Sequence, residues 1–208
     1  MELKPYKTLK TASEAETVIN KSKFISKCFP IQNEEEALTL LEGVRKQHAN
    51  ASHNCFAYCI GSRGEQKRFS DDGEPGGTAG LPIVEALNKS GITNALCVVT
   101  RYFGGILLGA GGLVRAYSGG AAAAITAAGV AFYVPGVTIE FEMDYSRYNI
   151  LESYIRGSSE IKDVKFLENV RIVVLIEREC ADGFMAGLVE RSDGRVVARV
   201  CGEAYIRK

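Results

Sequence analysis

The sequence carries no net charge, since 25 Lys and Arg residues balance 25 Asp and Glu residues over 208 positions. When the chain is divided at Pro135–Gly136, the first part has 14 basic and 12 acidic residues and the second has 11 and 13. Proteins that bind nucleic acid through bulk charge have a large basic excess. The balance excludes that class, so any nucleic-acid surface must be a local patch.

Long leucine-rich runs are also missing. The first 24 residues contain no apolar segment typical of a signal peptide. Residues 116–139 lack charge over a length that would span a membrane, but they are rich in Ala and Gly and are interrupted by Gly129, Pro135 and Gly136. A buried helix followed by a buried strand explains this run better. We therefore expect a soluble, cytoplasmic protein with no membrane partner.

The sequence lacks the paired cysteine spacing of a zinc site. Cys55 and Cys59 could join His53 in a metal site, but six scattered cysteines without a CxxC pair are more typical of reduced core residues. His53 and Cys55 share one face of an expected strand, which raises the alternative of a histidine-activated thiol, although no third orienting group is evident. We predict no metal and no cofactor, and the sequence identifies no catalytic residue.

Periodicity indicates an α+β fold with two domains, 1–135 and 136–208. In the first, Asn33 is expected to cap a helix because Glu36 follows three positions later. Strands alternate apolar and polar residues or form short apolar runs, and helices repeat apolar residues every three or four positions. On these criteria we expect strands over 22–30, 53–60, 65–69, 95–100 and around 132–134, and helices from Asn33, over 78–89 and over 112–128.

The last seventy residues follow a more regular order. Residues 137–143 alternate strictly, as a strand with one solvated face does. A helix over 145–156 is expected to end at Gly157. Strands over 161–167 and 171–176, a helix over 181–191 and a strand over 196–205 complete the order βαββαβ. This order predicts a ferredoxin-like second domain.

The stretch RFSDDGEPGGTAG, residues 68–80, concentrates Asp71, Asp72 and Glu74 within four positions. Turn formation and capping of a helix that opens at Thr78 explain two carboxylates more readily than three. The third calls for a cation, which could be an arginine from elsewhere, a metal ion or a basic partner. The spacing does not fit a calcium loop, while magnesium on one or two carboxylates stays open.

In the stretch VVTRYFGG, residues 98–105, an apolar strand ends in Arg101 and Tyr102, followed by Gly104 and Gly105. Arginine pairs with carboxylates or phosphates through two parallel hydrogen bonds. Arg101 could therefore neutralise the acidic stretch in a structural pair. It could equally face a phosphate beside Tyr102, whose ring could stack on a base. The sequence does not choose between these roles.

In the stretch LGAGGLVRAYSGG, residues 108–120, Gly109, Gly111 and Gly112 lead into a helix, and Arg115 lies one turn further on. Such loops direct free backbone N–H groups at an anion, but neither a P-loop nor a GxGxxG pattern is present. Close packing of a small-residue helix is the alternative. We predict that the three stretches meet at one end of the sheet, where the acids neutralise Arg101 and Arg115.

Together with HNCFAY, residues 53–58, these three stretches resemble the IMPACT family, whose bacterial members are the YigZ-like proteins. The resemblance implies a first domain like ribosomal protein S5 domain 2 and a ferredoxin-like second domain. It also implies a link to translation, because eukaryotic members regulate initiation by binding an activator of a stress kinase. Bacterial members have been labelled proline dipeptidases, but this chain offers no matching metal constellation. Many members have basic residues where this chain has Leu81 and Ile106, which weakens the case for a basic face.

Two functions follow. The first is a translation-linked regulatory protein that binds RNA, the ribosome or a translation factor. The second is an enzyme or sensor for a small phosphorylated, anionic ligand held on the glycine loops. A plainer alternative makes the acids and arginines a structural network. The sequence predicts neither the partner nor the oligomeric state.

Overall fold

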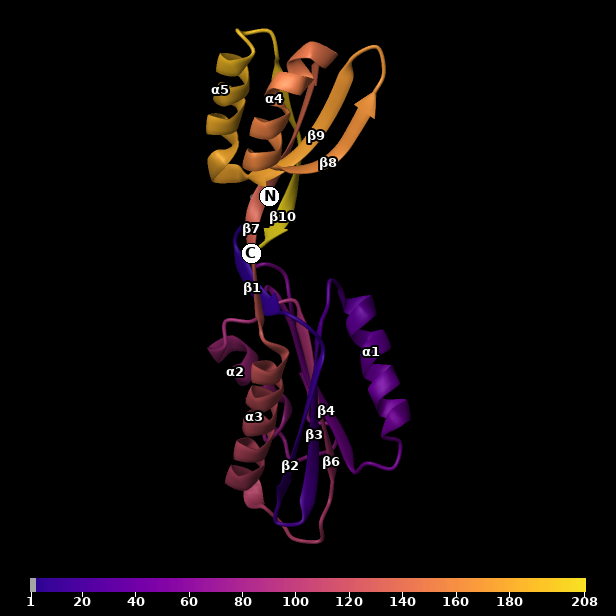
Figure 1. The fold of residues 1–208 in the computed structure, drawn as a ribbon. Helices are drawn as coiled ribbons and strands as arrows, with labels where there is room; N and C mark the ends of the chain where they lie inside the picture. Colours follow the sequence, from indigo (N-terminus) through magenta and orange to yellow (C-terminus); the bar gives the residue numbers. More distant parts are fainter. Residues whose placement is uncertain (1–2) are drawn as a thin grey trace. The chain divides into compact units, whose positions relative to one another are not determined.

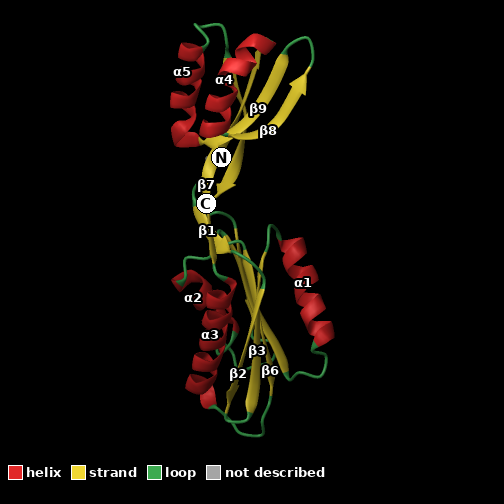
Figure 2. Ribbon diagram, viewed as in Figure 1, coloured by secondary structure: helices red, strands yellow, loops and turns green. Residues whose placement is uncertain are grey.

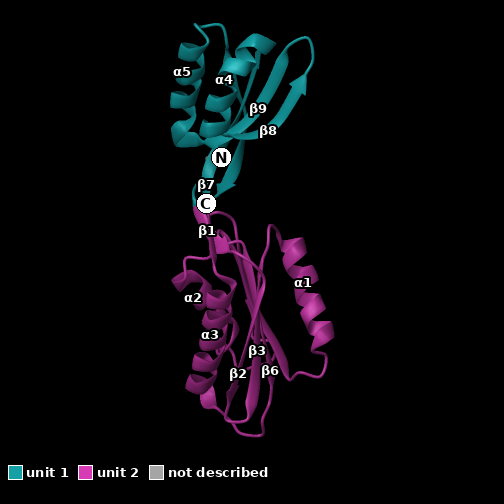
Figure 3. Ribbon diagram, viewed as in Figure 1, with its two compact units in different colours: residues 1–5, 133–208 teal, residues 6–132 magenta. Residues whose placement is uncertain are grey.

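The computed structural model describes residues 3–208, which form two β-sheets and five α-helices in a mixed α+β arrangement (Figures 1 and 2). The chain divides into two compact units, one formed by residues 6–132 and the other by residues 1–5 with 133–208 (Figure 3).

The 6–132 unit is built around a five-stranded antiparallel sheet in the order β2-β3-β6-β4-β5. Helix α1 covers one face of this sheet, and α2 and α3 cover the other (Figure 1). The elements of this unit are β1 (Tyr6–Leu9), β2 (Ser13–Ile19), β3 (Ser22–Pro30), α1 (Glu34–Gln47), β4 (His53–Ile60), β5 (Gln66–Ser70), α2 (Gly80–Lys89), β6 (Ala95–Tyr102) and α3 (Gly109–Ala128).

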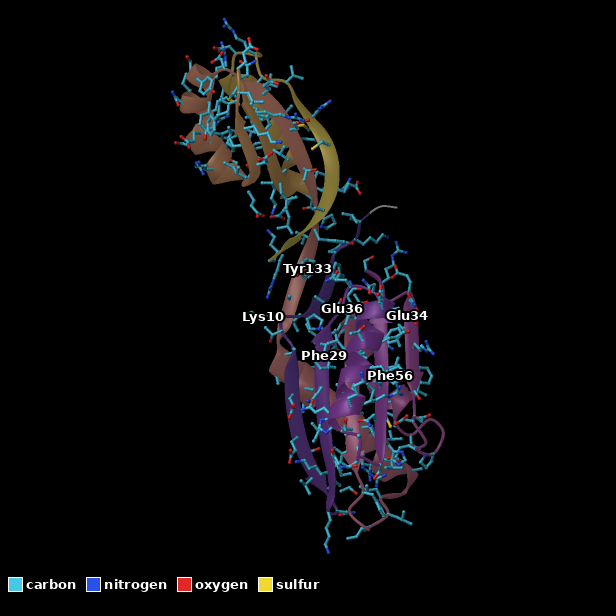
Figure 4. All side chains as sticks on the ribbon, turned by 90° about the vertical axis from the view of Figure 1, so that its right-hand side faces the viewer. Lys10, Phe29, Glu34, Glu36, Phe56 and Tyr133 are labelled. Carbon is cyan, nitrogen blue, oxygen red and sulfur yellow. The ribbon has the colours of Figure 1, made fainter. Side chains whose placement is uncertain are left out.

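The sheet has a hydrophobic core on each face, because successive side chains of a strand point to opposite faces. On β4, Cys55 and Ala57 pack toward α2 and α3, whereas Phe56 and Tyr58 pack toward α1. Phe29 packs against the core on the α1 side, and Figure 4 labels it with Phe56 on the strands beside α1. The sheet is therefore buried on both faces, which explains why its central strands read as continuous apolar runs.

Helix α1 begins as the sequence predicts. The side-chain oxygen of Asn33 accepts the N–H of Glu36 at 2.9 Å. The Glu36 carboxylate accepts the N–H of Gln32 at 2.7 Å, one residue before the position that a capping box uses. Glu34 and Glu36 lie in this first turn, where negative charge meets the positive end of the helix (Figure 4).

Helix α3 lies close to the sheet through small residues. Gly120 has no room for a side chain, since a Cβ there would lie 2.5 Å from Ser26 Oγ on β3. Nearby, the rings of Tyr117 on α3 and Phe24 on β3 meet edge to face, with centroids 5.4 Å apart. The packing interpretation of the glycine- and alanine-rich run is therefore correct for the later part of the helix.

The register of the sheet collects the candidate residues at one end. Arg101, near the end of β6, pairs with Phe24 on β3 and with His53 on β4. Because both neighbours run antiparallel to β6, their first residues flank its last ones. The 71–79 segment before α2 and the 103–108 loop before α3 reach this same end, as their contacts with His53 and Arg101 show.

Several expected boundaries were wrong. Helix α3 begins at Gly109 rather than near Gly112, so the glycines form its first turn and not a loop before it. Helix α2 begins at Gly80, two residues after the expected start at Thr78, whose hydroxyl donates to the carbonyl of Pro75 at 2.6 Å. Gly157 lies inside α4, where its surroundings are open and nothing forces the helix to end.

Strand β7 (Val130–Met143) runs without a break through Pro135–Gly136, where the sequence suggested a domain boundary. It leads into the second unit, whose remaining elements are α4 (Tyr145–Ser158), β8 (Glu160–Phe166), β9 (Val170–Glu177), a 3-10 turn (Arg178–Cys180), α5 (Ala181–Arg191) and β10 (Ala198–Arg207). Strands β1 and β2 precede the first expected strand and were not predicted.

The sheet of this second unit has the order β10-β7-β9-β8, and each neighbouring pair is antiparallel. Helices α4 and α5 pack their apolar faces on it through Leu151, Ile155, Phe184 and Leu188. The expected order of strand, helix, two strands, helix and strand is present from β7 to β10.

None of the helices within residues 3–208 combines the length and the apolar character that crossing a membrane requires. The uncharged run from Ala116 is divided between α3 and β7, so the expected helix followed by a strand is present. The start of β7 is not buried as expected, because Val130 is 52% and Phe132 38% exposed.

Candidate functional site

A buried ion pair lies at the centre of the site. Arg101 Nη1 lies 2.7 Å from Glu74 Oε1, and the two side chains are 6% and 3% exposed. The same carboxylate oxygen accepts the hydroxyl of Tyr117 at 2.6 Å. Burial raises the pKa of Tyr117, so the phenol stays protonated and serves as a donor. Glu74 is therefore held by donors from β6 and α3.

The guanidinium of Arg101 is only partly satisfied. Its Nη2 lies 3.4 Å from Ser22 Oγ, a long hydrogen bond, and its Nε is buried without a partner among the described residues. Its central carbon lies 5.6 Å from the ring centroid of Phe24 and 5.4 Å from that of Phe103. Aromatic faces at these distances stabilise the cation.

Asp71 organises the turn that leads into α2. Its carboxylate accepts the N–H groups of Gly77 at 2.8 Å, Ala79 at 2.9 Å and Gly80 at 2.8 Å. Burial raises the pKa of this carboxyl, but the three N–H donors lower it by more, so the net pKa lies below the ordinary value. Asp71 is thus a structural cap and not a partner of an arginine.

Asp72 is also engaged locally. One carboxylate oxygen accepts the N–H of Asn54 at 2.6 Å, and the other lies 3.6 Å from Arg45 of α1. The expectation that the acids jointly neutralise Arg101 and Arg115 is therefore correct for Glu74 with Arg101 and wrong for Asp71 and Asp72. The reason is geometric, because the N–H groups of the turn satisfy Asp71 and the N–H of Asn54 on β4 satisfies Asp72.

Arg115 does not join the pair. It is exposed on α3, and no ion pair to it is found among residues 3–208. Its guanidinium lies over Gly111 of the preceding turn. Because α3 begins at Gly109, Arg115 lies almost two turns into the helix, and only Gly109 of the three glycines lines the pocket described below.

Tyr102 is anchored from the other face of the sheet. Its hydroxyl lies 2.9 Å from Nδ1 of His48. The ring is half-buried, which leaves less of it for the proposed stacking on a base. Gly104 donates its N–H to Ser22 Oγ at 3.2 Å and lies directly on the backbone of Lys21, where a side chain would overlap the chain. Gly105 has a φ of +81°, which a residue with a side chain rarely adopts.

A pocket of about 390 Å³ opens beside the ion pair. It is lined by His53, Gly73, Glu74, Pro75, Arg101, Phe103, Leu107, Leu108, Gly109, Ala110 and Leu113. Its walls are thus mostly apolar, with His53, Glu74 and Arg101 as the ionisable groups. This volume and composition are typical of small-ligand pockets and of sites that receive one anchoring side chain.

His53 presents an acceptor to this pocket. Its Nδ1 lies 2.8 Å from the backbone carbonyl of Asp72, which can only accept, so Nδ1 carries the proton. In the neutral ring Nε2 is then unprotonated, and it lies 3.8 Å from Glu74 Oε1. The arrangement suits acceptance of an N–H or O–H from a ligand.

The thiol of Cys55 is not available as a nucleophile. Burial raises its pKa to about 12, and its Sγ lies 3.0 Å from the carbonyl oxygen of Asp71. Within residues 3–208, no three His, Cys, Asp or Glu side chains gather as a metal site would require. The features that the site offers for binding are thus the Glu74–Arg101 ion pair, the acceptor on His53 and the apolar pocket.

Sequence reasoning missed the apolar part of the site. Phe103 is 49% exposed, Ile106 43% and Leu107 85%, all in the loop between β6 and α3. Tyr117 was not among the predicted site residues, and its hydrogen bond to Glu74 depends on packing that no local pattern encodes. The available signal for the loop was the apolar run over residues 106–108, which lies between Gly105 and Gly109.

The sequence and the fold of this chain are similar to those of known proteins. The Impact N-terminal domain family matches residues 20–125. IMPACT family member YvyE of Bacillus subtilis is 38% identical over 99% of this chain and 95% of its own length. The Protein IMPACT homolog of Dictyostelium discoideum is 38% identical over 43% of this chain and 26% of its own. A crystal structure described as that of a hypothetical protein is 30% identical, covers 96% of this chain and 98% of its own, and superposes with a TM-score of 0.65. The chain belongs to the IMPACT family.

Proposed function

We propose that this chain is a translation-linked regulatory protein that acts by binding RNA, the ribosome or a translation factor, and that its binding surface is the Arg101 end of the 6–132 unit. We further propose a fold like ribosomal protein S5 domain 2 for residues 1–135 and a ferredoxin-like fold for 136–208. The order β10-β7-β9-β8 with two helices on one face supports the second assignment. The cytoplasm, where translation takes place, is the proposed location.

One observation carries the binding proposal. The 103–108 loop, which we call the apolar loop, exposes Phe103, Ile106 and Leu107 beside a pocket. Exposed apolar side chains gathered next to a pocket are typical of protein-binding surfaces. Of the three partner classes, a protein is favoured, because Arg101 is paired with Glu74 and the chain has no basic excess.

The family relation supplies the link to translation. The resemblance implies that eukaryotic members regulate initiation through a protein partner, which agrees in kind with an apolar surface. Leu81 and Ile106, which replace basic residues of many members, are 42% and 43% exposed. This surface thus has apolar groups where a nucleic-acid face would have cations.

Co-sedimentation with ribosomes and pull-down with purified translation factors, both at low salt, test the proposal. Leu107→Ser should reduce association at least about tenfold, since an exposed anchor residue contributes on this scale. Leu167→Ser is the matched control, because Leu167 is also an exposed loop leucine, 66% exposed, in the other unit. If neither ribosomes nor factors associate, or if both variants behave alike, the proposal is wrong.

A second function has support from one feature. Helix α3 begins at Gly109 with no side-chain cap and no acidic residue in its first turn, as phosphate-binding helices do. On this alternative the chain is an enzyme or sensor for a small phosphorylated ligand. Thermal unfolding with nucleotides and phosphorylated metabolites, with and without Mg²⁺, tests it, and the absence of any stabilisation would exclude it.

A further inference from the structure

The pocket beside the ion pair has room for one large side chain. Its volume is about 390 Å³, near the lower end of the range for ligand sites. Phe103, Leu107, Leu108 and Leu113 supply its apolar walls. Phe103 and Leu107 are 49% and 85% exposed, so a guest side chain packed against them would remove a large apolar area from water. The pocket therefore favours a large apolar or aromatic anchor.

His53 adds a hydrogen-bond acceptor to these walls. Its Nδ1–H donates to the carbonyl of Asp72 at 2.8 Å, so Nε2 of the neutral ring carries a lone pair. The separation of 3.8 Å between Nε2 and Glu74 Oε1 is too long for a hydrogen bond. Nε2 is also absent from the buried unpartnered atoms of residues 3–208, which leaves it open to the pocket. A guest side chain that brings a donor is matched by this acceptor.

Among large apolar side chains, tryptophan and tyrosine carry such a donor. The indole N–H of tryptophan only donates, whereas a tyrosine hydroxyl also has lone pairs that need a donor when buried. The guanidinium of Arg101, which lines the pocket, is already engaged by Glu74. Tryptophan therefore satisfies the acceptor and fills the apolar space without leaving a polar atom unpaired.

Exposed cations flank the pocket on two sides. Lys21, in the turn between β2 and β3, lies against the loop before α3, because a side chain at Gly104 would overlap its carbonyl (Figure 1). The guanidinium of Arg115 lies over Gly111, the neighbour in sequence of the pocket residue Ala110. Both Lys21 and Arg115 are exposed, and neither makes an ion pair within residues 3–208.

The acidic groups at this end of the sheet are already engaged. Glu74 is 3% exposed and is bound by Arg101 and Tyr117. The carboxylate of Asp71 accepts three N–H groups of its own turn, and that of Asp72 accepts an N–H of β4. These acids therefore do not balance the two exposed cations. A partner segment with acidic residues on either side of its anchor complements them.

We propose that this pocket receives a tryptophan from an acidic segment of a partner protein, with the indole ring against the apolar walls and its N–H donated to His53 Nε2. Acidic residues on either side of the tryptophan then lie near Lys21 and Arg115. A buried aromatic anchor surrounded by weaker contacts is the usual form of an interface hot spot. The inference rests on the proposed binding function and specifies its partner by chemistry.

Tryptophan fluorescence tests the inference directly, because the chain itself contains no tryptophan. The probe is a synthetic peptide with one central tryptophan, Gly-Ser spacers and Asp-Glu at both ends, excited at wavelengths that tyrosine does not absorb. Its emission should shift to shorter wavelength and saturate as the full chain is added, since the indole leaves water. An unchanged emission spectrum overturns the inference.

Replacement of the anchor tests what the pocket recognises, with binding followed by the anisotropy of a dye on the peptide. Benzothienylalanine keeps the shape of the ring but has sulfur in place of the N–H. It should bind about three- to tenfold more weakly, because His53 Nε2 loses its donor. Leucine should bind at least about tenfold more weakly than tryptophan. Equal binding of the tryptophan peptide and either replacement overturns the assignment.

A small competitor separates a partner segment from a free ligand. N-acetyltryptophanamide has the indole but no acidic residues, so it should displace the labelled peptide only at concentrations at least about tenfold above those of the unlabelled peptide. Displacement by both at the same concentration would make the pocket a small-molecule site and overturn the partner assignment.

Matched variants of the full chain locate the site. Ala110→Phe places a ring in the pocket wall, whereas Ala123→Phe makes the same change at an exposed position in the middle of α3. We expect a loss of at least about tenfold for the first and a change within about twofold for the second. Arg115→Glu should weaken binding about two- to fivefold, the scale of an exposed ion pair, and Lys46→Glu, at an exposed position of α1, should not. Equal effects within either pair overturn the placement.

The ribosome experiment separates this inference from the proposed function. If Leu107→Ser abolishes association with ribosomes or factors but Ala110→Phe and the tryptophan peptide leave it unchanged, the binding function stands and the tryptophan inference fails. If the peptide binds as predicted but no ribosome or factor associates, the reverse holds.

Discussion

Arg101 Nη1 and Glu74 Oε1, which lie 2.7 Å apart, connect β6 to the segment before α2 inside the protein. Removal of one partner leaves the other charge buried and unpaired. We expect Arg101→Ala to lower the free energy of unfolding by about 3–5 kcal/mol, measured by urea denaturation. The double variant Arg101→Met/Glu74→Met should recover a large part of this loss, because apolar replacement removes both desolvated charges. A double variant less stable than Arg101→Ala would contradict the account.

Asp71 should contribute to the pH dependence of stability. Burial raises the pKa of its carboxyl, but N–H donors from Gly77, Gly80 and Ala79 outweigh burial and lower the folded-state pKa below the unfolded value of about 3.9. A depressed folded pKa gives stability that is present above the unfolded pKa and is lost as the pH falls through the folded pKa. Below about pH 4, Asp71→Asn should therefore lose stability less steeply than the wild type.

At neutral pH the same Asp71→Asn variant should be less stable by about 1–3 kcal/mol, since it loses a charged acceptor of three hydrogen bonds. Urea midpoints measured across the pH range report both effects. Glu190→Gln serves as the control, because its side chain is 83% exposed and its removal should leave the curve unchanged. Parallel curves for wild type and Asp71→Asn would show that Asp71 does not contribute.

The sequence predicted the elements better than their ends. Residues 22–30, 53–60 and 181–191 were assigned with the observed bounds, because alternation and helical spacing are local signals. The start of α3 was misplaced because glycines suggested a loop. The core packing of Leu113, Ala116 and Tyr117 in the early turns of α3 outweighs the low helix propensity of the glycines before them.

Two glycines near the site should respond to alanine in opposite ways. A methyl group at Gly104 would overlap the carbonyl of Lys21, a backbone atom that cannot move aside cheaply. At Gly111 a methyl group would meet only the flexible end of Arg115 at 3.6 Å. Gly104→Ala should lower stability by about 1–3 kcal/mol, and Gly111→Ala should raise it by up to about 1 kcal/mol. Thermal unfolding checks the two signs, and a stable Gly104→Ala variant would contradict the close approach.

The exposed cysteines should react faster than the buried ones. Cys180 and Cys201 are exposed, and Cys28, Cys55, Cys59 and Cys97 are buried. Burial raises the pKa of Cys55 to about 12, so its reactive thiolate is negligible at neutral pH. Alkylation of the folded protein by iodoacetamide, followed by mass spectrometry, should label Cys180 and Cys201 first. Rapid labelling of Cys55 would reopen the interpretation of a histidine-activated thiol.

The candidate site was predictable in its location but not in its contacts. The strand end at Arg101, the acidic turn and the glycines before α3 pointed to one end of the sheet, and Glu74 does pair with Arg101. The sequence could not show that Asp71 and Asp72 are satisfied by N–H groups of the turn and of β4, because these bonds depend on three-dimensional approach. The apolar loop was missed for a related reason, since exposure is a property of the folded chain.

One continuous helix, α3, contains both the close contact with β3 and part of the pocket wall. Gly120, seated on Ser26, and Gly109, at the pocket, are separated by eleven residues, or about 16 Å along the axis. A bulkier residue at Gly120 would shift the whole helix away from or along β3. It would so displace the pocket wall without touching any bound molecule. Substitutions at Gly120 can thus change which ligand a related chain prefers, although the position lies far from the pocket. Selection for altered affinity should therefore yield substitutions at Gly120.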